Sequence, residues 1–138
     1  MQNLPTCSIE IEVPFHDVDS MNIVWHGNYT KYFEVARCKL LESFGYCYKA
    51  MAKSGYAWPV VDMRLKYVNP AKFGQRIRVT ATLKEWEYRL KINYEIADAE
   101  TGEKLTKGYT TQVAIDMNSG EMCYESPPIL AARLGIDG

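Results

Sequence analysis

FHDVDSMNIVWHGNYTKYFEVAR, residues 15–37, is the stretch that decides how this chain folds. Its first half is polar and turn-prone and carries two acids, Asp17 and Asp19. Its second half begins at His26 and Gly27 and has the spacing of an amphipathic helix. A carboxylate therefore precedes a helix N-terminus, where free backbone N–H groups and the helix dipole favour negative charge. A carboxylate and free N–H donors are sufficient to attack a carbonyl and hold the resulting oxyanion.

The helix is expected to run from Asn28 to about Phe44, because apolar residues recur there at offsets of three and four. The predicted apolar face consists of Tyr29, Phe33, Ala36, Leu40 and Phe44, widened by Val35 and Leu41. Gly45 favours a helix end at this point. A second, short helix is expected from Tyr46 to Ser54, again followed by a glycine.

Strand patterns lie on both sides of the helical segment. Alternating apolar residues predict strands at 7–14, 58–67, 75–85, 89–97 and 107–116. A short terminal helix is expected at 127–134, with proline near its first turn. Consecutive strands joined by short turns pair antiparallel, and a single long helix must bury its apolar stripe against the sheet. The sequence predicts one α+β domain over 1–138, an antiparallel sheet of five or more strands wrapped around a central helix.

The composition excludes several classes of partner. The formal net charge is −1, from 16 basic and 17 acidic residues, which argues against nucleic acid and against an anionic membrane surface. The apolar runs are too short to cross a bilayer, and the N-terminus lacks the features of a secretory signal. The four cysteines form no C-x-x-C pair and have no accompanying histidine pair, so we expect reduced thiols, no metal site and a cytoplasmic protein.

The motif D-V-D-S-M-N-I-V-W-H-G-N-Y at 17–29, running into Y-F-E-V-A-R at 32–37, resembles a known family. It is similar to the hotdog-fold, 4-hydroxybenzoyl-CoA thioesterase-like acyl-CoA thioesterases, and the likeness continues more weakly through 61–70 and 84–86. The resemblance implies a cofactor-free enzyme that hydrolyses an acyl-CoA or an acyl carrier protein thioester. It also implies a homo-oligomer, either a dimer or a homotetramer, with active sites at the interface between subunits.

The resemblance assigns the catalytic roles to Asp19 and His26. Asp19 is the second acid of D-x-D, and it serves either as a nucleophile that forms an acyl anhydride or as a general base that activates water. The His26 backbone N–H is the implied oxyanion donor, and its side chain either orients the carbonyl, moves a proton or only packs. For Asp17 we prefer a structural role, a hydrogen bond that holds the loop.

Five further residues are predicted to contact the substrate: Asn22, Trp25, Gly27, Tyr29 and Arg89. Many members of the family have glycine at the position of Asn22, so we expect a positive φ there, which asparagine tolerates well. Trp25 and Tyr29 belong either to the core or to the wall of an acyl pocket.

Basic residues are expected where the phosphates of coenzyme A bind. Arg64, Lys66, Arg89 and Lys91 are candidates, although each is equally well explained as an ordinary surface charge. Glu34 is a minor catalytic candidate on the polar face of the helix. Cys38 lies twelve positions from His26, about 18 Å along a helix, so the two cannot pair directly within one subunit.

Two other functions remain open from the sequence. A hotdog dehydratase or hydratase acting on a 3-hydroxyacyl thioester would use Asp19 and His26 as an acid/base pair, although the D-x-D loop fits a thioesterase better. A non-catalytic thioester-binding module would be expected to lose the loop acid, which this chain retains. The acyl group and its carrier cannot be read from the residues.

Overall fold

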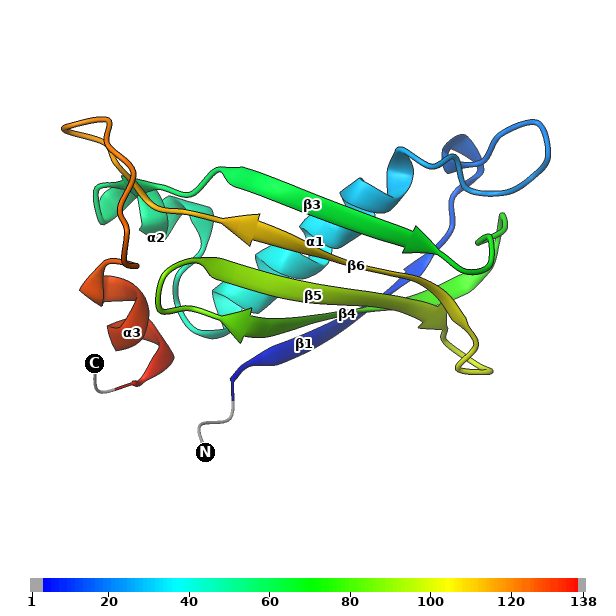
Figure 1. The fold of residues 1–138 in the computed structure, drawn as a ribbon. Coiled ribbons are helices and arrows are strands. Elements are labelled where there is room, and N and C mark those ends of the chain that lie inside the picture. The colour runs from blue at the N-terminus through cyan, green and yellow to red at the C-terminus, as the bar shows by residue number, and fades with distance from the viewer. Residues whose placement is uncertain (1–3, 137–138) are drawn as a thin grey trace.

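The amphipathic segment forms one long helix, α1 (Asn28–Ser43), and a five-stranded antiparallel sheet packs against it (Figure 1). The computed structural model describes residues 4–136. The other elements are β1 (Thr6–Glu12), η1 (Phe15–Asp17), α2 (Tyr48–Lys53), β2 (Tyr56–Ala57), β3 (Val60–Tyr67), β4 (Arg76–Glu85), β5 (Leu90–Asp98), β6 (Lys104–Gln112), β7 (Ile115–Asp116) and α3 (Pro128–Leu134). The sheet order is β1-β4-β5-β6-β3, and β2 pairs separately with β7. The predicted α+β architecture is confirmed.

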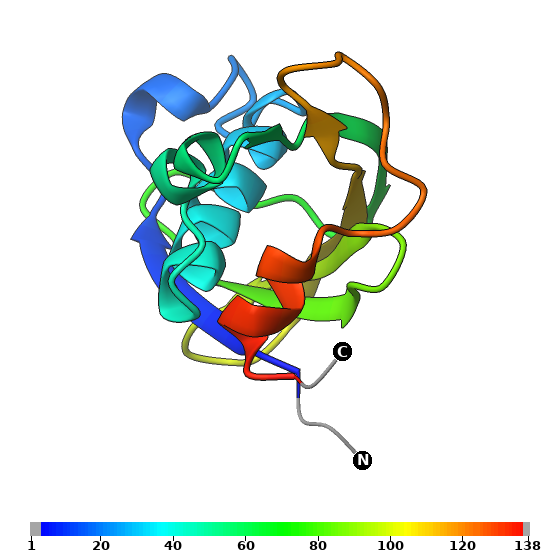
Figure 2. The same ribbon diagram turned by 90° about the vertical axis from the view of Figure 1, so that its left-hand side faces the viewer.

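The core lies between α1 and the inner face of the sheet. Strict alternation along β4 and β5 directs one apolar row from each strand towards the helix. These rows are Ile77, Val79, Ala81 and Leu83, and Leu90, Ile92, Tyr94 and Ile96. Figure 2 shows the sheet curving around one side of α1. Burial of this apolar surface is the main term that stabilises the fold.

The buried face of α1 differs from the predicted one. Val35 was expected to extend the apolar face, but its side chain is 43% exposed. Tyr32 and Arg37 are buried instead, because elements outside the sheet also pack against the helix. Tyr32 donates a hydrogen bond to Asp17 of η1, and Arg37 donates one to Tyr48 of α2. The helix therefore has polar buried contacts that apolar spacing alone does not reveal.

The β6 region also differs from its prediction. The strand ends at Gln112, before β7, rather than continuing to Asp116. Its inner face is polar, and two of the buried side chains have partners. Thr110 shares a 2.7 Å hydrogen bond with Tyr94, and the Gln112 amide donates to the Trp58 carbonyl at 2.7 Å. These pairs replace the apolar row that the alternation of the sequence suggested.

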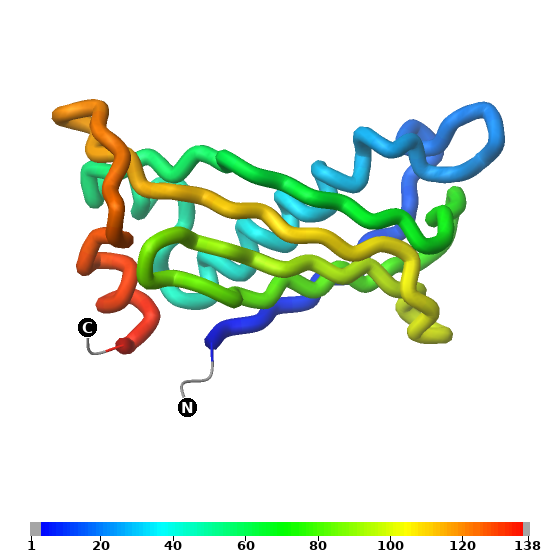
Figure 3. The backbone as a smooth tube through the Cα atoms, viewed as in Figure 1, coloured from blue at the N-terminus to red at the C-terminus, as the bar shows by residue number. Residues whose placement is uncertain are grey.

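Two features of the overall arrangement matter for function. The loop that connects η1 to α1 lies at one end of the molecule, and α3 lies at the other end beside the β4–β5 turn (Figure 3). β3 is an edge strand of the sheet, and most of its residues are exposed. In the part of the chain that the structure describes, we find no helix with the length and apolar character needed to span a membrane. All four cysteines are free thiols.

Candidate active site

The loop before α1 is a short hairpin. The Asp19 N–H donates to the Ile23 carbonyl at 2.9 Å, and the Trp25 N–H donates to the Asp17 carbonyl at 3.0 Å. Residues 17–19 and residues 23–25 form the two arms of this hairpin. Asn22 lies in the turn between them with φ 65°, which confirms the expected positive φ. Asparagine tolerates this conformation better than most residues, so the loop forms without glycine.

Asp17 anchors the hairpin to the helix. Its carboxylate is almost completely buried and accepts hydrogen bonds from Lys31 Nζ at 2.6 Å and from the Tyr32 hydroxyl at 2.7 Å. Its carbonyl also accepts a hydrogen bond from the Asn28 side chain at 2.9 Å. Burial raises the pKa of Asp17, but the hydrogen bonds from Lys31 and Tyr32 outweigh burial and bring the pKa below its usual value. The structural role expected for this acid is confirmed.

Asp19 has a different environment only two residues further on. Its side chain is exposed, and Oδ1 accepts a hydrogen bond from the Met21 N–H at 2.8 Å. This local contact is typical of an Asx turn and orients the carboxylate without burying it. Residues 4–136 provide no cation within ion-pair distance of Asp19. The second carboxylate oxygen therefore remains available to a substrate or a water molecule.

The start of α1 presents free donors close to this hairpin. Gly27 is the N-cap residue, no side chain caps the helix, and no acidic residue lies in its first turn. Within the described residues, neither the His26 N–H nor the Gly27 N–H donates to a backbone carbonyl. These groups are the unpaired donors that every helix leaves at its N-terminus. The His26 N–H is the group to which the family resemblance assigns the oxyanion role.

A cavity of about 260 Å³ adjoins the start of the helix. It is lined by Ile23, Val24, His26, Tyr29, Tyr67, Val68, Asn69 and Pro70. The His26 ring stacks on Tyr67, with 4.8 Å between ring centroids and an interplanar angle of 28°. Asp19 is linked to this cavity through the backbone, because its N–H donates to the carbonyl of Ile23, one of the lining residues. The volume is slightly below the range of about 300–1,000 Å³ typical of ligand sites.

Tyr29 belongs both to the core and to the wall of the cavity, the two alternatives that the sequence left open. Its side chain is buried, and its hydroxyl accepts a hydrogen bond from the Ala71 N–H at 3.1 Å. The same side chain lines the cavity beside His26. Tyr67 was missed by the sequence analysis. The available signal was an aromatic residue at the end of a strand and just before the Asn69-Pro70 turn.

Trp25 lies against the helix start rather than in the core. Its side chain is 61% exposed, and its ring covers Gly27 so closely that a Cβ placed there would lie 2.1 Å from Cζ3 of the indole. Gly27 itself has ordinary helical angles, φ −64° and ψ −20°. Glycine therefore permits the close approach of the Trp25 ring, and the backbone conformation itself does not require it.

Arg89 lies apart from the other predicted site residues. It follows the β4–β5 turn at the far end of the molecule, where its guanidinium binds Glu85 at 2.5 Å. A single chain does not bring it to the cavity beside His26. Of the other basic candidates, Lys91 lies over the Tyr109 ring at 4.6 Å, and Arg64 and Lys66 lie on the outer face of the sheet.

The remaining candidates have ordinary surroundings. Glu34 is exposed on the polar face of α1. Cys38 is a partly buried free thiol, and burial raises its pKa. Across residues 4–136, no three His, Cys, Asp or Glu side chains gather as a metal site requires.

Comparisons with known proteins agree with the fold and with the loop motif. The Thioesterase-like superfamily matches residues 13–134. "Putative acyl-CoA thioesterase YneP" from Bacillus subtilis is 32% identical over 111 residues, covering 80% of each chain. A DHNA-CoA thioesterase from Staphylococcus aureus is 29% identical, with a TM-score of 0.77 over 86% of this chain and 80% of that chain.

A further solved structure extends the likeness over almost the whole fold. Slr0204, a 1,4-dihydroxy-2-naphthoyl-CoA thioesterase from Synechocystis, has a TM-score of 0.84 at 22% identity, covering 95% of this chain and 96% of that chain. This likeness shows the hotdog fold, and the family match together with the YneP relative shows an enzyme of the thioesterase class. The chain belongs to the Thioesterase-like superfamily.

Proposed function

We propose that this protein hydrolyses acyl-CoA thioesters, with Asp19 as the reacting carboxylate and the start of α1 as the oxyanion site. The observation that carries this proposal is an exposed, unneutralised carboxylate on the hairpin that leads into a helix start with unpaired N–H groups, where the His26 side chain lines a cavity. The names of the YneP and Staphylococcus aureus relatives, at 32% and 29% identity, support coenzyme A as the carrier.

Two chemical routes use this geometry. In the first, an Asp19 oxygen attacks the thioester carbonyl, the carbon–sulfur bond breaks, coenzyme A leaves as a thiolate that takes up a proton, and water hydrolyses the acyl anhydride. In the second, Asp19 takes a proton from an attacking water and returns it to the departing thiolate. In both routes the His26 and Gly27 N–H groups stabilise the negative charge on the carbonyl oxygen.

We infer that the site is completed by a second copy of the chain paired along β3. This edge strand exposes apolar side chains, including Val61 at 57% and Met63 at 42%, and such an edge favours pairing with another strand. A two-fold axis through an antiparallel β3–β3 pair would bring the Val60 end of one strand beside the Tyr67 end of the other. The small cavity at Tyr67 would then gain a wall from the partner.

The test is release of free thiol from a panel of aromatic, short-chain and long-chain acyl-CoA substrates. We expect Asp19→Asn to lower kcat by about 10²–10⁴-fold, the usual range for loss of a positioned acid or base. Glu42→Gln, which removes an exposed carboxylate near the other end of α1, is the matched control and should retain the wild-type rate. Full activity in Asp19→Asn, or formation of an enoyl thioester without thiol release, would contradict the proposal.

A further inference from the structure

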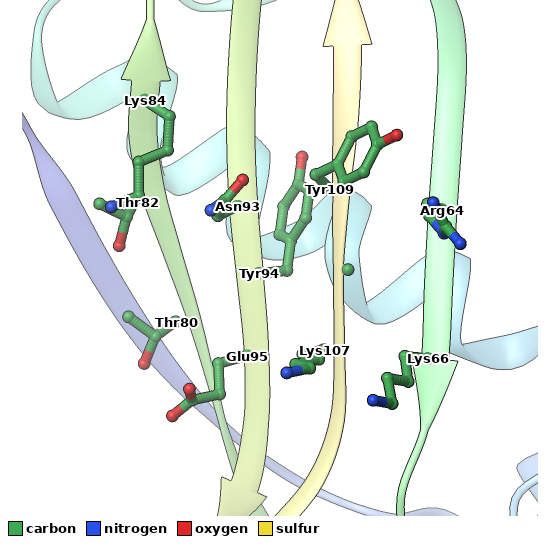
Figure 4. Close-up of a pocket in the computed structure, with 11 residues that line it drawn as sticks. Arg64, Lys66, Thr80, Thr82, Lys84, Asn93, Tyr94, Glu95, Lys107 and Tyr109 are labelled. Carbon is green, nitrogen blue, oxygen red and sulfur yellow. The ribbon is translucent and has the colours of Figure 1, made fainter.

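The outer face of the sheet carries a groove of about 630 Å³ that the proposed catalytic site does not use (Figure 4). It is lined by Arg64, Lys66, Thr80, Thr82, Lys84, Asn93, Tyr94, Glu95, Lys107, Gly108 and Tyr109. The labelled side chains come from β3, β4, β5 and β6, so the groove crosses four of the five strands. Their register places Arg64, Tyr109, Asn93 and Thr82 in one row across the sheet.

The groove concentrates positive charge that is not neutralised. Arg64, Lys66, Lys84 and Lys107 have no carboxylate within 4.0 Å among residues 4–136. Glu95, the acid in the lining, is already paired with Lys104. The whole chain has a formal charge of −1, so the fold gathers these cations on one face. Such a face attracts anionic partners.

The floor of the groove also has an unmet hydrogen-bonding group. Asn93 Oδ1 is buried and, in the described part of the chain, has no donor. Buried side-chain oxygens in folded proteins almost always have a partner. A donor from a molecule seated in the groove, next to Thr82 and Tyr109, would satisfy it.

The layout of the cations favours a broad acidic surface over a small phosphate. The four cations extend across the sheet from β3 to β4, which is three strand spacings. At 4.7–4.9 Å per spacing, they extend over about 14 Å. Compact phosphate sites use backbone N–H groups or a helix N-terminus, whereas on a sheet face the N–H groups point along the ladder. Three of the four cations are lysines, flexible point charges that suit carboxylates spread over a protein surface. A second copy of this face would be repelled by like charge.

The groove and the candidate active site lie on opposite faces of the sheet and meet along the chain at the end of β3. Lys66 lies in the groove, and the next residue, Tyr67, lines the cavity with His26. An extended thioester arm from a protein bound on the outer face would therefore pass the end of β3 to reach Asp19. We propose that this groove binds the acidic surface of a protein that carries the acyl group on such an arm. This proposal rests on the thioesterase function proposed above.

Charge reversal in the groove tests this proposal. The variants are the pair Lys66→Glu and Lys107→Glu together, and Lys84→Glu alone, which lies across the sheet on β4. Lys53→Glu, an exposed lysine on α2, is the matched control. The probe is a purified acyl carrier protein loaded with a dodecanoyl group, with binding measured by calorimetry and thiol release measured alongside dodecanoyl-CoA.

We expect the groove variants to weaken carrier binding and kcat/KM for the carrier substrate by about 10-fold or more, because like charges now face each other. Rates with dodecanoyl-CoA and the Lys53→Glu control should stay within about 2-fold of wild type, and added salt should weaken carrier binding. Lysines exposed on a sheet face are not required for the core, so the variants should fold, as circular dichroism will show.

Three outcomes would overturn the proposal: no binding of the carrier to the wild type, unchanged binding in the groove variants, or an equal loss of activity with both substrates. The last would assign the groove to the coenzyme A nucleotide. If the wild type cleaves neither substrate, the proposed hydrolysis is wrong, whatever the result of the binding experiment. Binding of the carrier through the groove would in that case still support the docking surface.

Discussion

Two acids only two residues apart in the hairpin before α1 have opposite surroundings. Asp17, in the first arm, is buried and bound by Lys31 and Tyr32 of the helix. Asp19 is exposed, and within residues 4–136 its side chain accepts a hydrogen bond only from the nearby Met21 N–H, while its own N–H donates to Ile23, which lines the cavity. The charge of Asp17 is neutralised by contacts that hold the loop, whereas the charge of Asp19 remains available to a substrate.

This difference explains why a polar loop next to a helix N-terminus can hold a stable shape. The helix already holds Lys31 and Tyr32 in position when Asp17 binds them. These hydrogen bonds to a charged group fix the first part of the loop. The exposed acid can then remain free without the loop collapsing onto it. The following predictions test this division of roles, starting with the largest effect on stability.

Asp17→Asn should lower the free energy of unfolding by about 1–3 kcal/mol, because it leaves buried donors without a charged acceptor. Asp19→Asn should change it by less than about 0.5 kcal/mol, as expected for an exposed site. Urea unfolding of both variants and the wild type measures the two values. Equal destabilisation by both substitutions would show that the two acids do not differ in this way.

The contribution of Asp17 should disappear in acid. Since its native pKa lies below the unfolded value, the carboxylate stabilises the fold above about pH 4, and this stability is lost as the pH falls through the native pKa. The gap in unfolding free energy between wild type and Asp17→Asn should therefore shrink from about pH 7 to about pH 3. A gap that stays constant over this range would mean that the ionised form is not favoured.

Asn22→Ala should destabilise the hairpin by about 1 kcal/mol, because alanine is strained at φ 65°. Asn22→Gly removes this strain and should stay within about 0.5 kcal/mol of the wild type, which makes it the matched control. Thermal unfolding followed by circular dichroism gives the comparison. If alanine is tolerated as well as glycine, the turn is not held in the left-handed region in solution.

Gly27→Ala should have the smallest effect, below about 1 kcal/mol, because the clashing atoms belong to an exposed ring that can rotate away. The same change in a Trp25→Ala background should cost less, since the indole is then absent. A double-mutant cycle by urea unfolding measures this coupling. No coupling between the two positions would show that Trp25 does not rest on Gly27.

Much of the fold could be predicted because its elements have strong local signals. The period of Tyr29, Phe33, Ala36 and Leu40 specified α1, and strict alternation specified β4 and β5. The burial of Tyr32 and Arg37 was not predicted, because contacts of α1 outside the sheet are not encoded in apolar spacing. Those contacts come from Asp17 and Tyr48, residues distant in sequence from their partners on the helix.

The residues alone determined that a turn-prone D-x-D segment precedes a helix start, since turn propensity, helix period and free N-terminal donors are local properties. Only the tertiary structure decided which acid is buried, that Tyr67 joins His26, that Arg89 lies at the far end, and that four cations share one face of the sheet. These outcomes depend on strand order and register, which bring together residues separated by tens of positions along the chain.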